Sequence, residues 1–327
     1  MNRREEVLKA TREAAALLDR FPPTGRMSFD VMAVTAELGI PVLYRPLQGL
    51  WGAAVTMGTG VRGILITTKL NRAIQRFTLA HELGHLLLGH TISLDESVGV
   101  AGRFGSTART TYELAADTFA SELLAPRRLM LAASKLHRWT KQSLGDPSNI
   151  YQLSLRLGTS YKATCWALAA QNIFPPSRAT DLQNRDVAEL KQAIAPKSEM
   201  MDSWADVWRL TSGDADTLVE AGPNDIFDVQ LEEQASTGFL WQLADAGDFS
   251  EVLDNNVEFG SGFGESSTRH VRLRFTSPGT HRLLFEHLRP WNKQTLAHID
   301  VHIDNEGKET GGISRMVRRS SLARLAS

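Results

Sequence analysis

The sequence predicts an α+β protein of more than one domain, with helices predominating before about residue 216 and short strands after it. Its 327 residues exceed the roughly 250 at which a single hydrophobic core stops growing. Apolar residues recur at helical spacing in the N-terminal part, whereas apolar and polar residues alternate between turn residues over 216–305. The composition, 42% hydrophobic and 22% charged, is ordinary for a globular protein.

Charge and cysteine content narrow the class of protein. The formal net charge of −1 excludes a molecule that binds nucleic acid through overall charge. Cys165 is the only cysteine, so no disulfide can form within the chain and a reducing compartment is expected. There is no run of 18 apolar residues, and the charged N-terminus lacks the apolar core of a signal peptide. We therefore expect no membrane span and a cytoplasmic protein.

Residues 1–135 are expected to form one domain of helices and a few strands. Their apolar residues recur near the helical period in some segments and form short β-branched runs in others. Prolines and glycines mark the boundaries between them. In chain order, we expect helices over 4–20 and 28–39, strands over 40–44, 51–55 and 63–67, and helices over 73–89 and 111–124.

The rest of the chain divides into four parts. Residues 136–196 are expected to be helical, with two short helices joined at Gly158-Thr159-Ser160. Weak periodicity predicts a linker over 197–215. The alternating runs of 216–305 predict a small antiparallel sandwich with strands over 227–231, 239–243, 271–275, 281–285 and 297–303. The Gly-, Ser- and Arg-rich tail, 306–327, is expected to be flexible.

The clearest chemical motif lies in residues 77–90, which read Phe-Thr-Leu-Ala-His-Glu-Leu-Gly-His-Leu-Leu-Leu-Gly-His. Residues four apart on a helix share a face, so His81 and His85 can bind one metal ion, and imidazole is a preferred zinc ligand. Glu82 can take a proton from a water on that metal. The flanking apolar residues predict a buried helix, in which such a cluster without a metal would be costly. These features predict a zinc-protease site with one Zn²⁺ per chain.

A catalytic zinc usually has three protein ligands, so a third must come from elsewhere. A pattern with a histidine ten residues after the first does not fit, because that position is Thr91. His90 is one residue short. On a continuous helix it would lie opposite His81, at roughly 100° per residue. We therefore interpret His90 as structural.

The best candidate for the third ligand is Glu113, in the predicted helix over 111–124. It shares a helix face with Asp117. We expect Glu113 to bind the metal and Asp117 to accept a hydrogen bond from a ligand histidine. Asp95, Glu96 and Asp117 remain alternative third ligands. The oxyanion-stabilising group is not identified, and the candidates are His90, Tyr112 and Arg128.

Residues 28–126 resemble the ImmA/IrrE family of metallopeptidases. The resemblance rests on 77–90 and on 113–126, which reads Glu-x-x-Ala-Asp-x-Phe-Ala-x-Glu-Leu-Leu-Ala-Pro. The family often has an acid and an asparagine two and four residues after the ligand glutamate, where this chain has Ala115 and Asp117. The resemblance implies a gluzincin-like, single-zinc protease domain over 1–135. Its targets are typically partner proteins such as DNA-binding repressors.

Family members often continue into a helix-turn-helix-like segment, and residues 149–161 look like one. Its second helix, 161–171, offers only Lys162 and Gln171 to DNA, although DNA reading needs several basic and amide residues. A structural or substrate-handling role for 136–196 is therefore favoured over direct DNA binding.

The sandwich resembles chagasin-type cysteine-protease inhibitors over about 216–304. Residues 235–241 look like that family's N-P-T-T-G-Y-x-W loop, 260–264 its Gly-rich loop, and 288–291 its R-P-W loop. In that family the three loops lie at one end of an immunoglobulin-like sandwich and plug a protease cleft. The resemblance implies that this end can bind a partner protein through Ser236, Thr237, Gly238, Gly262, Arg289, Pro290 and Trp291.

The sequence thus predicts a zinc-dependent endopeptidase that cleaves a protein partner, such as a DNA-binding repressor or an antitoxin-like regulator. The C-terminal sandwich would serve recognition or regulation. Two alternatives remain open. One is a zinc-containing binding or sensor protein without proteolytic activity, and the other is a protease inhibitor that acts through its C-terminal domain.

Overall fold

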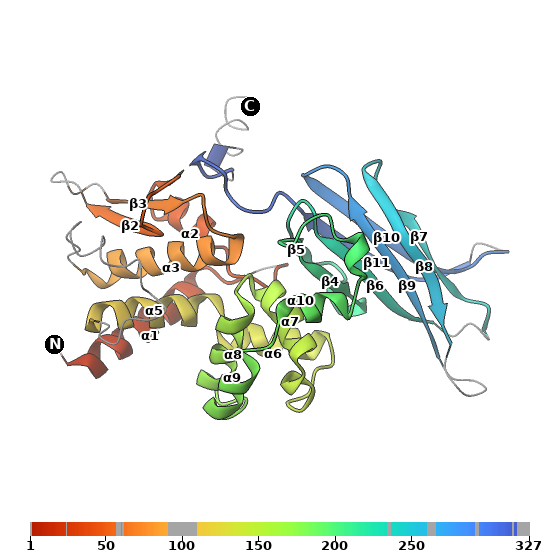
Figure 1. The fold of residues 1–327 in the computed structure, drawn as a ribbon, viewed down its shortest axis with the longest axis horizontal. Coiled ribbons are helices and arrows are strands. Elements are labelled where there is room, and N and C mark those ends of the chain that lie inside the picture. Colours follow the sequence, from red (N-terminus) through yellow and green to blue (C-terminus); the bar gives the residue numbers. More distant parts are fainter. Residues whose placement is uncertain are drawn as a thin grey trace.

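A computed structural model describes residues 2–23, 25–56, 60, 62–90, 110–233, 237–259, 266–291, 294–315 and 317–318. Along these residues an N-terminal part of helices and strands, a helical middle part and a C-terminal sandwich follow one another (Figure 1). This order confirms the predicted α+β class. None of the helices in these ranges combines the length and apolarity that a bilayer span requires.

The N-terminal part is layered. Its helices are α1 (Arg3–Arg20), α2 (Val31–Glu37), α3 (Arg72–Leu88) and α5 (Thr111–Leu124), and its strands are β1 (Val42–Arg45), β2 (Gly52–Thr56) and β3 (Arg62–Thr67). Among the described residues the sheet order is β12-β1-β3-β2, with β1 parallel to β3 and β2 antiparallel to it. Helix α3 lies between this sheet and α5, and α1 packs against α5 (Figure 1).

Two glycines define how α3 sits in its layer. At Gly84 a Cβ atom would lie 2.8 Å from the Cδ1 of Phe119, so only glycine lets α5 approach this closely. Gly89 ends α3 in the left-handed conformation, with φ of 74°, as is common at helix C-termini. The helix therefore ends at Leu88, and the chain turns away before His90.

The middle part consists of α6 (Arg127–Leu136), α7 (Pro147–Leu157), α8 (Tyr161–Ala170), α9 (Pro176–Leu182) and α10 (Val187–Gln192). Gly158, with φ of 65°, joins α7 to α8. Tyr161, Cys165 and Leu168 on α8 are buried in the core of this part. That packing agrees with the structural role favoured from the sequence.

The sandwich contains two sheets, which within the described residues have the orders β5-β11-β10-β7 and β4-β6-β9-β8. Their facing sides bury an apolar core that includes Phe227, Trp241, Leu273 and Phe285. The strands are β4 (Val207–Leu210), β5 (Leu218–Glu220), β6 (Ile226–Glu233), β7 (Leu240–Asp245), β8 (Ser250–Glu258), β9 (Ser267–Phe275), β10 (Thr280–Arg289) and β11 (Gln294–Asp304).

Three expectations about this part were wrong in detail. Residues 197–215 are not all linker, because β4 pairs with β6 and buries Trp208 and Leu210. The sandwich is not wholly antiparallel, since β4–β6 and β5–β11 run parallel. The tail is not flexible from residue 306, because β12 (Gly312–Ile313) pairs with β1 of the N-terminal sheet.

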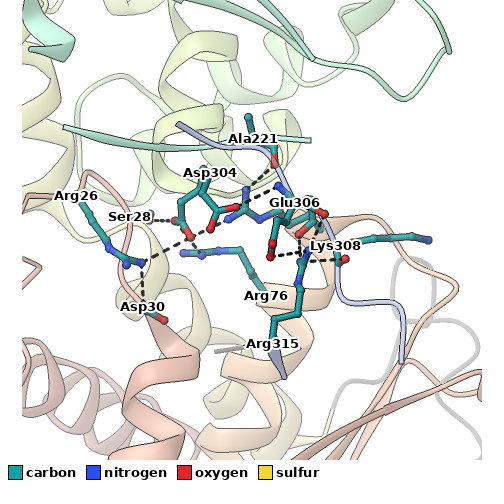
Figure 2. Close-up of polar contacts among 12 residues, drawn as sticks. Arg26, Ser28, Asp30, Arg76, Ala221, Asp304, Glu306, Lys308 and Arg315 are labelled. Atoms are coloured by element: carbon teal, nitrogen blue, oxygen red, sulfur yellow. Dashed lines mark hydrogen bonds and ion pairs between the residues drawn. The ribbon is translucent and has the colours of Figure 1, made fainter. Parts of the chain in front are cut away.

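The tail is attached to the N-terminal part by hydrogen bonds as well as by β12. Lys308 Nζ donates to the Thr68 carbonyl at 2.9 Å. The side-chain amide of Gln75 makes two bonds of 3.0 Å with the backbone of Glu309. Figure 2 shows Arg315 folded back over the tail, where its guanidinium donates to the carbonyl of Glu306 at 2.7 Å.

An ion-pair cluster joins the sandwich to α3. Glu220, at the end of β5, accepts from Arg72 Nη2 at 2.7 Å and from Arg76 Nη1 at 3.4 Å. Arg26 and Ser28 contact the same carboxylate from the segment before α2 (Figure 2). Burial raises the pKa of Glu220, but Arg72 and Arg76 outweigh burial and lower it from 4.5 to about 2. Glu220 is therefore ionised and neutralises cations on α3.

We expect Glu220→Gln to lower the free energy of unfolding by about 3 kcal/mol at pH 7, because it leaves partly buried arginines without their anion. A carboxyl whose pKa is lower in the folded protein stabilises the fold at pH values above its pKa in the unfolded chain. This stabilisation is lost as the pH falls toward its pKa in the folded protein. The difference between wild type and variant should therefore shrink as the pH falls from about 4.5 to about 2. Urea denaturation across this range measures it.

Glu251→Gln is the matched control, since it removes a more exposed pair with Arg274. It should cost less than about 1 kcal/mol. Equal losses for the two variants would contradict a joining role for Glu220.

Candidate metal centre

Helix α3 supplies two buried imidazoles. The His81 and His85 side chains are 0% and 2% exposed, and their Nε2 atoms lie 3.0 Å apart. This proximity follows from the four-residue spacing, which places both side chains on one helix face. The close approach allowed at Gly84 directs that face toward α5.

Helix α5 supplies a carboxylate to the same point. Thr110 caps the helix by accepting from the Glu113 N–H at 3.2 Å, which fixes Glu113 in the first turn. Its Oε2 lies 3.4 Å from His81 Nε2 and its Oε1 lies 3.3 Å from His85 Nε2. One ligand atom from each of the three residues lies within 4.8 Å of the others. The structure thus brings together two histidines and the glutamate named as third ligand from the sequence.

Asp117 lies behind His81, one turn further along α5 than Glu113. Its Oδ1 is 2.9 Å from His81 Nδ1. A carboxylate can only accept, so Nδ1 carries the hydrogen and the neutral ring directs the Nε2 lone pair toward Glu113 and His85. Asp117 therefore occupies the far side of the ring from the point where the three ligand atoms meet.

The donor set fits a zinc ion. Nitrogen lone pairs and a carboxylate directed at one buried point repel one another unless a cation lies between them, and two imidazoles with one carboxylate form a common catalytic zinc set. The carboxylate of Glu113 would supply the negative charge that such a cation requires.

Glu82 lies between α3 and the sheet. It is 2% exposed, and its Oε2 accepts from the backbone N–H of Ala54 on β2 at 3.0 Å. This bond holds the Glu82 carboxylate against the edge of the sheet, next to His81 in the sequence. Among the described residues β2 pairs only with β3, so its other edge adjoins Glu82.

The reason given for setting His90 aside was wrong. The helix does not continue to residue 90, because Gly89 ends it, so helical phase does not apply. His90 Nδ1 lies 3.0 Å from His85 Nδ1, on the opposite side of that ring from Glu113. His90 is thus outside the group of ligand atoms but in contact with one member. Gly89, a typical helix-ending residue, was the signal in the sequence that could have revealed this.

Other candidates from the sequence are placed elsewhere. Arg128 bonds to Asp19 and to the Leu18 carbonyl on α1, so it does not serve the metal centre as an oxyanion donor. The alternative ligands Asp95 and Glu96 lie outside the described residues.

The inhibitor-like loop residues gather at the far end of the sandwich. Gly238, with φ of 79°, contacts Trp291, whose side chain is 70% exposed. The Arg289 guanidinium lies 4.4 Å above the Phe239 ring and donates to the Thr237 carbonyl at 3.3 Å. Pro290 joins Arg289 to Trp291, whereas Ser236 and Gly262 lie outside the described residues. In Figure 1 this end is at the right and α3 is at the left, so the loops point away from the metal centre.

The fold and the site together define a metallopeptidase-type domain followed by a protease-inhibitor-type sandwich. Residues 35–169 match the peptidase family described as the IrrE N-terminal-like domain, and residues 220–303 match the chagasin family of peptidase inhibitors. The chain therefore carries one domain of each family, as the two resemblances predicted. The peptidase match supports metallopeptidase-type activity.

Comparison with curated proteins finds no match. Among solved structures, a cysteine protease inhibitor from Entamoeba histolytica is 20% identical, with a TM-score of 0.30, and the match covers 31% of this chain and 97% of the inhibitor. A Mycobacterium tuberculosis transcriptional regulator is 14% identical, with a TM-score of 0.35, and the match covers 82% of this chain and 75% of the regulator.

We expect Glu113→Ala to weaken zinc binding by more than the roughly 10- to 100-fold that loss of an outer-sphere partner costs, because it removes one of three ligands. Competition with a chromogenic chelator measures the affinity. Glu122→Ala is the control on the same helix, where Glu122 bonds to Gln171 instead. Unchanged affinity in Glu113→Ala would exclude Glu113 as a ligand.

Proposed function

We propose that the N-terminal domain is a zinc-dependent endopeptidase in which His81, His85 and Glu113 hold the ion. The observation that carries this proposal is the convergence of their ligand atoms within 4.8 Å, next to the buried Glu82. Among the described residues these three form the group that could hold one ion, and a catalytic zinc usually has three protein ligands. The match to a peptidase family adds independent support.

When bound, zinc would lower the pKa of a water and polarise the scissile carbonyl. Two side chains of the protein have the remaining roles. Glu82 takes the proton of the attacking water and delivers a proton to the leaving amine. Asp117 holds His81 in the tautomer whose Nε2 can bind a metal.

We further propose that the substrate is a protein, such as a DNA-binding repressor or an antitoxin-like regulator. Within the described part of the chain the outer edge of β2 has no strand partner, which supports a polypeptide substrate, because an extended chain can add to a sheet edge through backbone hydrogen bonds. Such a chain would run beside Glu82, whose carboxylate contacts β2. The resemblance to the ImmA/IrrE family supports a repressor-like target.

Glu82→Gln should lower the rate of cleavage of a substrate protein by about 10²- to 10⁴-fold, because the amide cannot accept the proton of water. Candidate repressors encoded near the gene are incubated with zinc-loaded protein, and products are identified by mass spectrometry. Zinc content should stay at wild-type level, since Glu82 is not a ligand. Full zinc occupancy with no Glu82-dependent cleavage would favour a non-proteolytic binding or sensor protein.

The sandwich supports a second candidate function, inhibition of a protease by its loop end. The chagasin-family match and the exposed Trp291 favour this. A bulky aromatic side chain next to an arginine is a typical anchor in protein interfaces. Because these loops point away from α3, they would act on another protein and leave the metal centre of the same chain open.

Trp291→Ala should weaken binding to a papain-like protease by more than 2 kcal/mol, about 30-fold in Kd, if Trp291 is the anchor. The full-length protein is titrated against papain and residual activity is followed. Leu296→Ala, which removes another exposed apolar side chain, is the control. No inhibition by wild type at micromolar concentration would end this second proposal.

A further inference from the structure

A buried chain of hydrogen bonds lies behind His85. His85 Nδ1 is 3.0 Å from His90 Nδ1, and His90 Nε2 is 3.4 Å from the Oε2 of Glu6 on α1. The side chains of Glu6 and His90 are 0% and 3% exposed. The Tyr112 ring covers His90, with ring centroids 4.4 Å apart. From the sequence, His90 was interpreted as structural and named only as a candidate oxyanion donor, and Glu6 was given no role.

The direction of each bond follows from what its atoms can do. The Glu6 carboxylate accepts, so His90 Nε2 carries a hydrogen. A neutral His90 then has an unprotonated Nδ1, which accepts from His85 Nδ1–H. His85 in turn is unprotonated at Nε2, the atom that faces His81 Nε2 and Glu113. The chain of bonds from Glu6 thus selects the tautomer of His85 that can bind a metal.

We propose that Glu6 and His90 are positioning residues of the metal centre, which fix the orientation and tautomer of His85 as Asp117 does for His81. This inference rests on the proposed zinc site. Both ligand histidines then have an acceptor for the hydrogen on Nδ1. For His81 the acceptor is the carboxylate of Asp117, and for His85 it is the imidazole of His90. Such outer partners raise the basicity of the ligand nitrogen and hold its ring in place.

Burial of Glu6 supports a specific role for its charge. A carboxylate with no solvent exposure is costly unless it has a partner, and one of its oxygens, Oε1, has none among the described residues. An apolar side chain would pack at this site without that cost. The glutamate contributes what an apolar residue cannot, an anionic acceptor for His90.

The opposite arrangement of hydrogens is disfavoured. If His90 were an imidazolium, its Nδ1–H would donate to His85 and leave a hydrogen on His85 Nε2, where it would block the metal.

The proposed role of Glu6 extends the metal centre to α1, a helix outside the matched peptidase region. That region begins at residue 35, whereas α1 covers residues 3–20. Helix α1 also contacts the C-terminus of α3, because Lys9 Nζ donates to the Leu88 carbonyl at 2.6 Å. Helix α1 thus holds both the end of α3 and the imidazole that follows it.

The test compares zinc affinity in full-length variants by chelator competition, with circular dichroism as a check on folding. We expect His90→Leu to weaken zinc binding by about 10- to 100-fold, because His85 loses its acceptor. His90→Asn should recover most of the affinity, since its amide offers an acceptor and a donor. Glu6→Gln should weaken binding, whereas Glu13→Gln, about two turns further along α1, should not.

A second measurement does not depend on zinc. Long-range ¹⁵N–¹H spectra of the metal-free protein report which nitrogen of each imidazole carries hydrogen, and we expect Nδ1–H at His85. Hydrogen at Nε2 instead, or equal zinc affinity in wild type and folded His90→Leu, would overturn the inference. Absence of zinc binding in wild type would instead overturn the proposed function, so the two failures are distinguishable.

Discussion

The close packing of α3 against α5 is the contact on which the metal centre depends. It is possible because position 84 has no side chain and Phe119 occupies the space that a Cβ atom would need. This contact buries two imidazoles and brings Glu113 within 3.4 Å of both. Polar groups at such depth are costly unless each has a partner, and that requirement explains the contacts with Asp117, His90 and Glu6.

The sandwich is fixed to the peptidase-type domain rather than joined by a flexible tether. Glu220 binds arginines of α3, and buried Arg156 on α7 pairs with Asp214 at 2.8 Å. The tail then returns to the N-terminal sheet as β12. These contacts direct the exposed loops of the sandwich away from the metal centre (Figure 1). The proposed protease site and the proposed binding loops therefore contact different molecules or distant parts of one molecule.

The expectations from sequence succeeded where a pattern repeats and failed where pairing depends on distant residues. Helices α1, α3 and α5 follow the apolar period, and their observed ends lie within a residue or two of the expected ones. Strand β8 was missed because it is an edge strand rich in Asp, Asn and Glu, which have low β-propensity. Strands β4, β5 and β12 are short, and they are defined by hydrogen bonds to strands that lie far away in the sequence or in another part of the fold.

The sequence by itself determined the chemistry of the centre, because the four-residue spacing of His81 and His85 fixes their shared helix face. It also identified Glu113 and Asp117 as a pair on another helix. It could not determine which residues stand behind His85, since helical phase holds only while the helix continues and Gly89 ends it. Tertiary structure decided that His90 turns back and that Glu6, 84 residues away along the chain, meets it. Contacts between distant segments depend on how whole helices pack, and no local spacing encodes that packing.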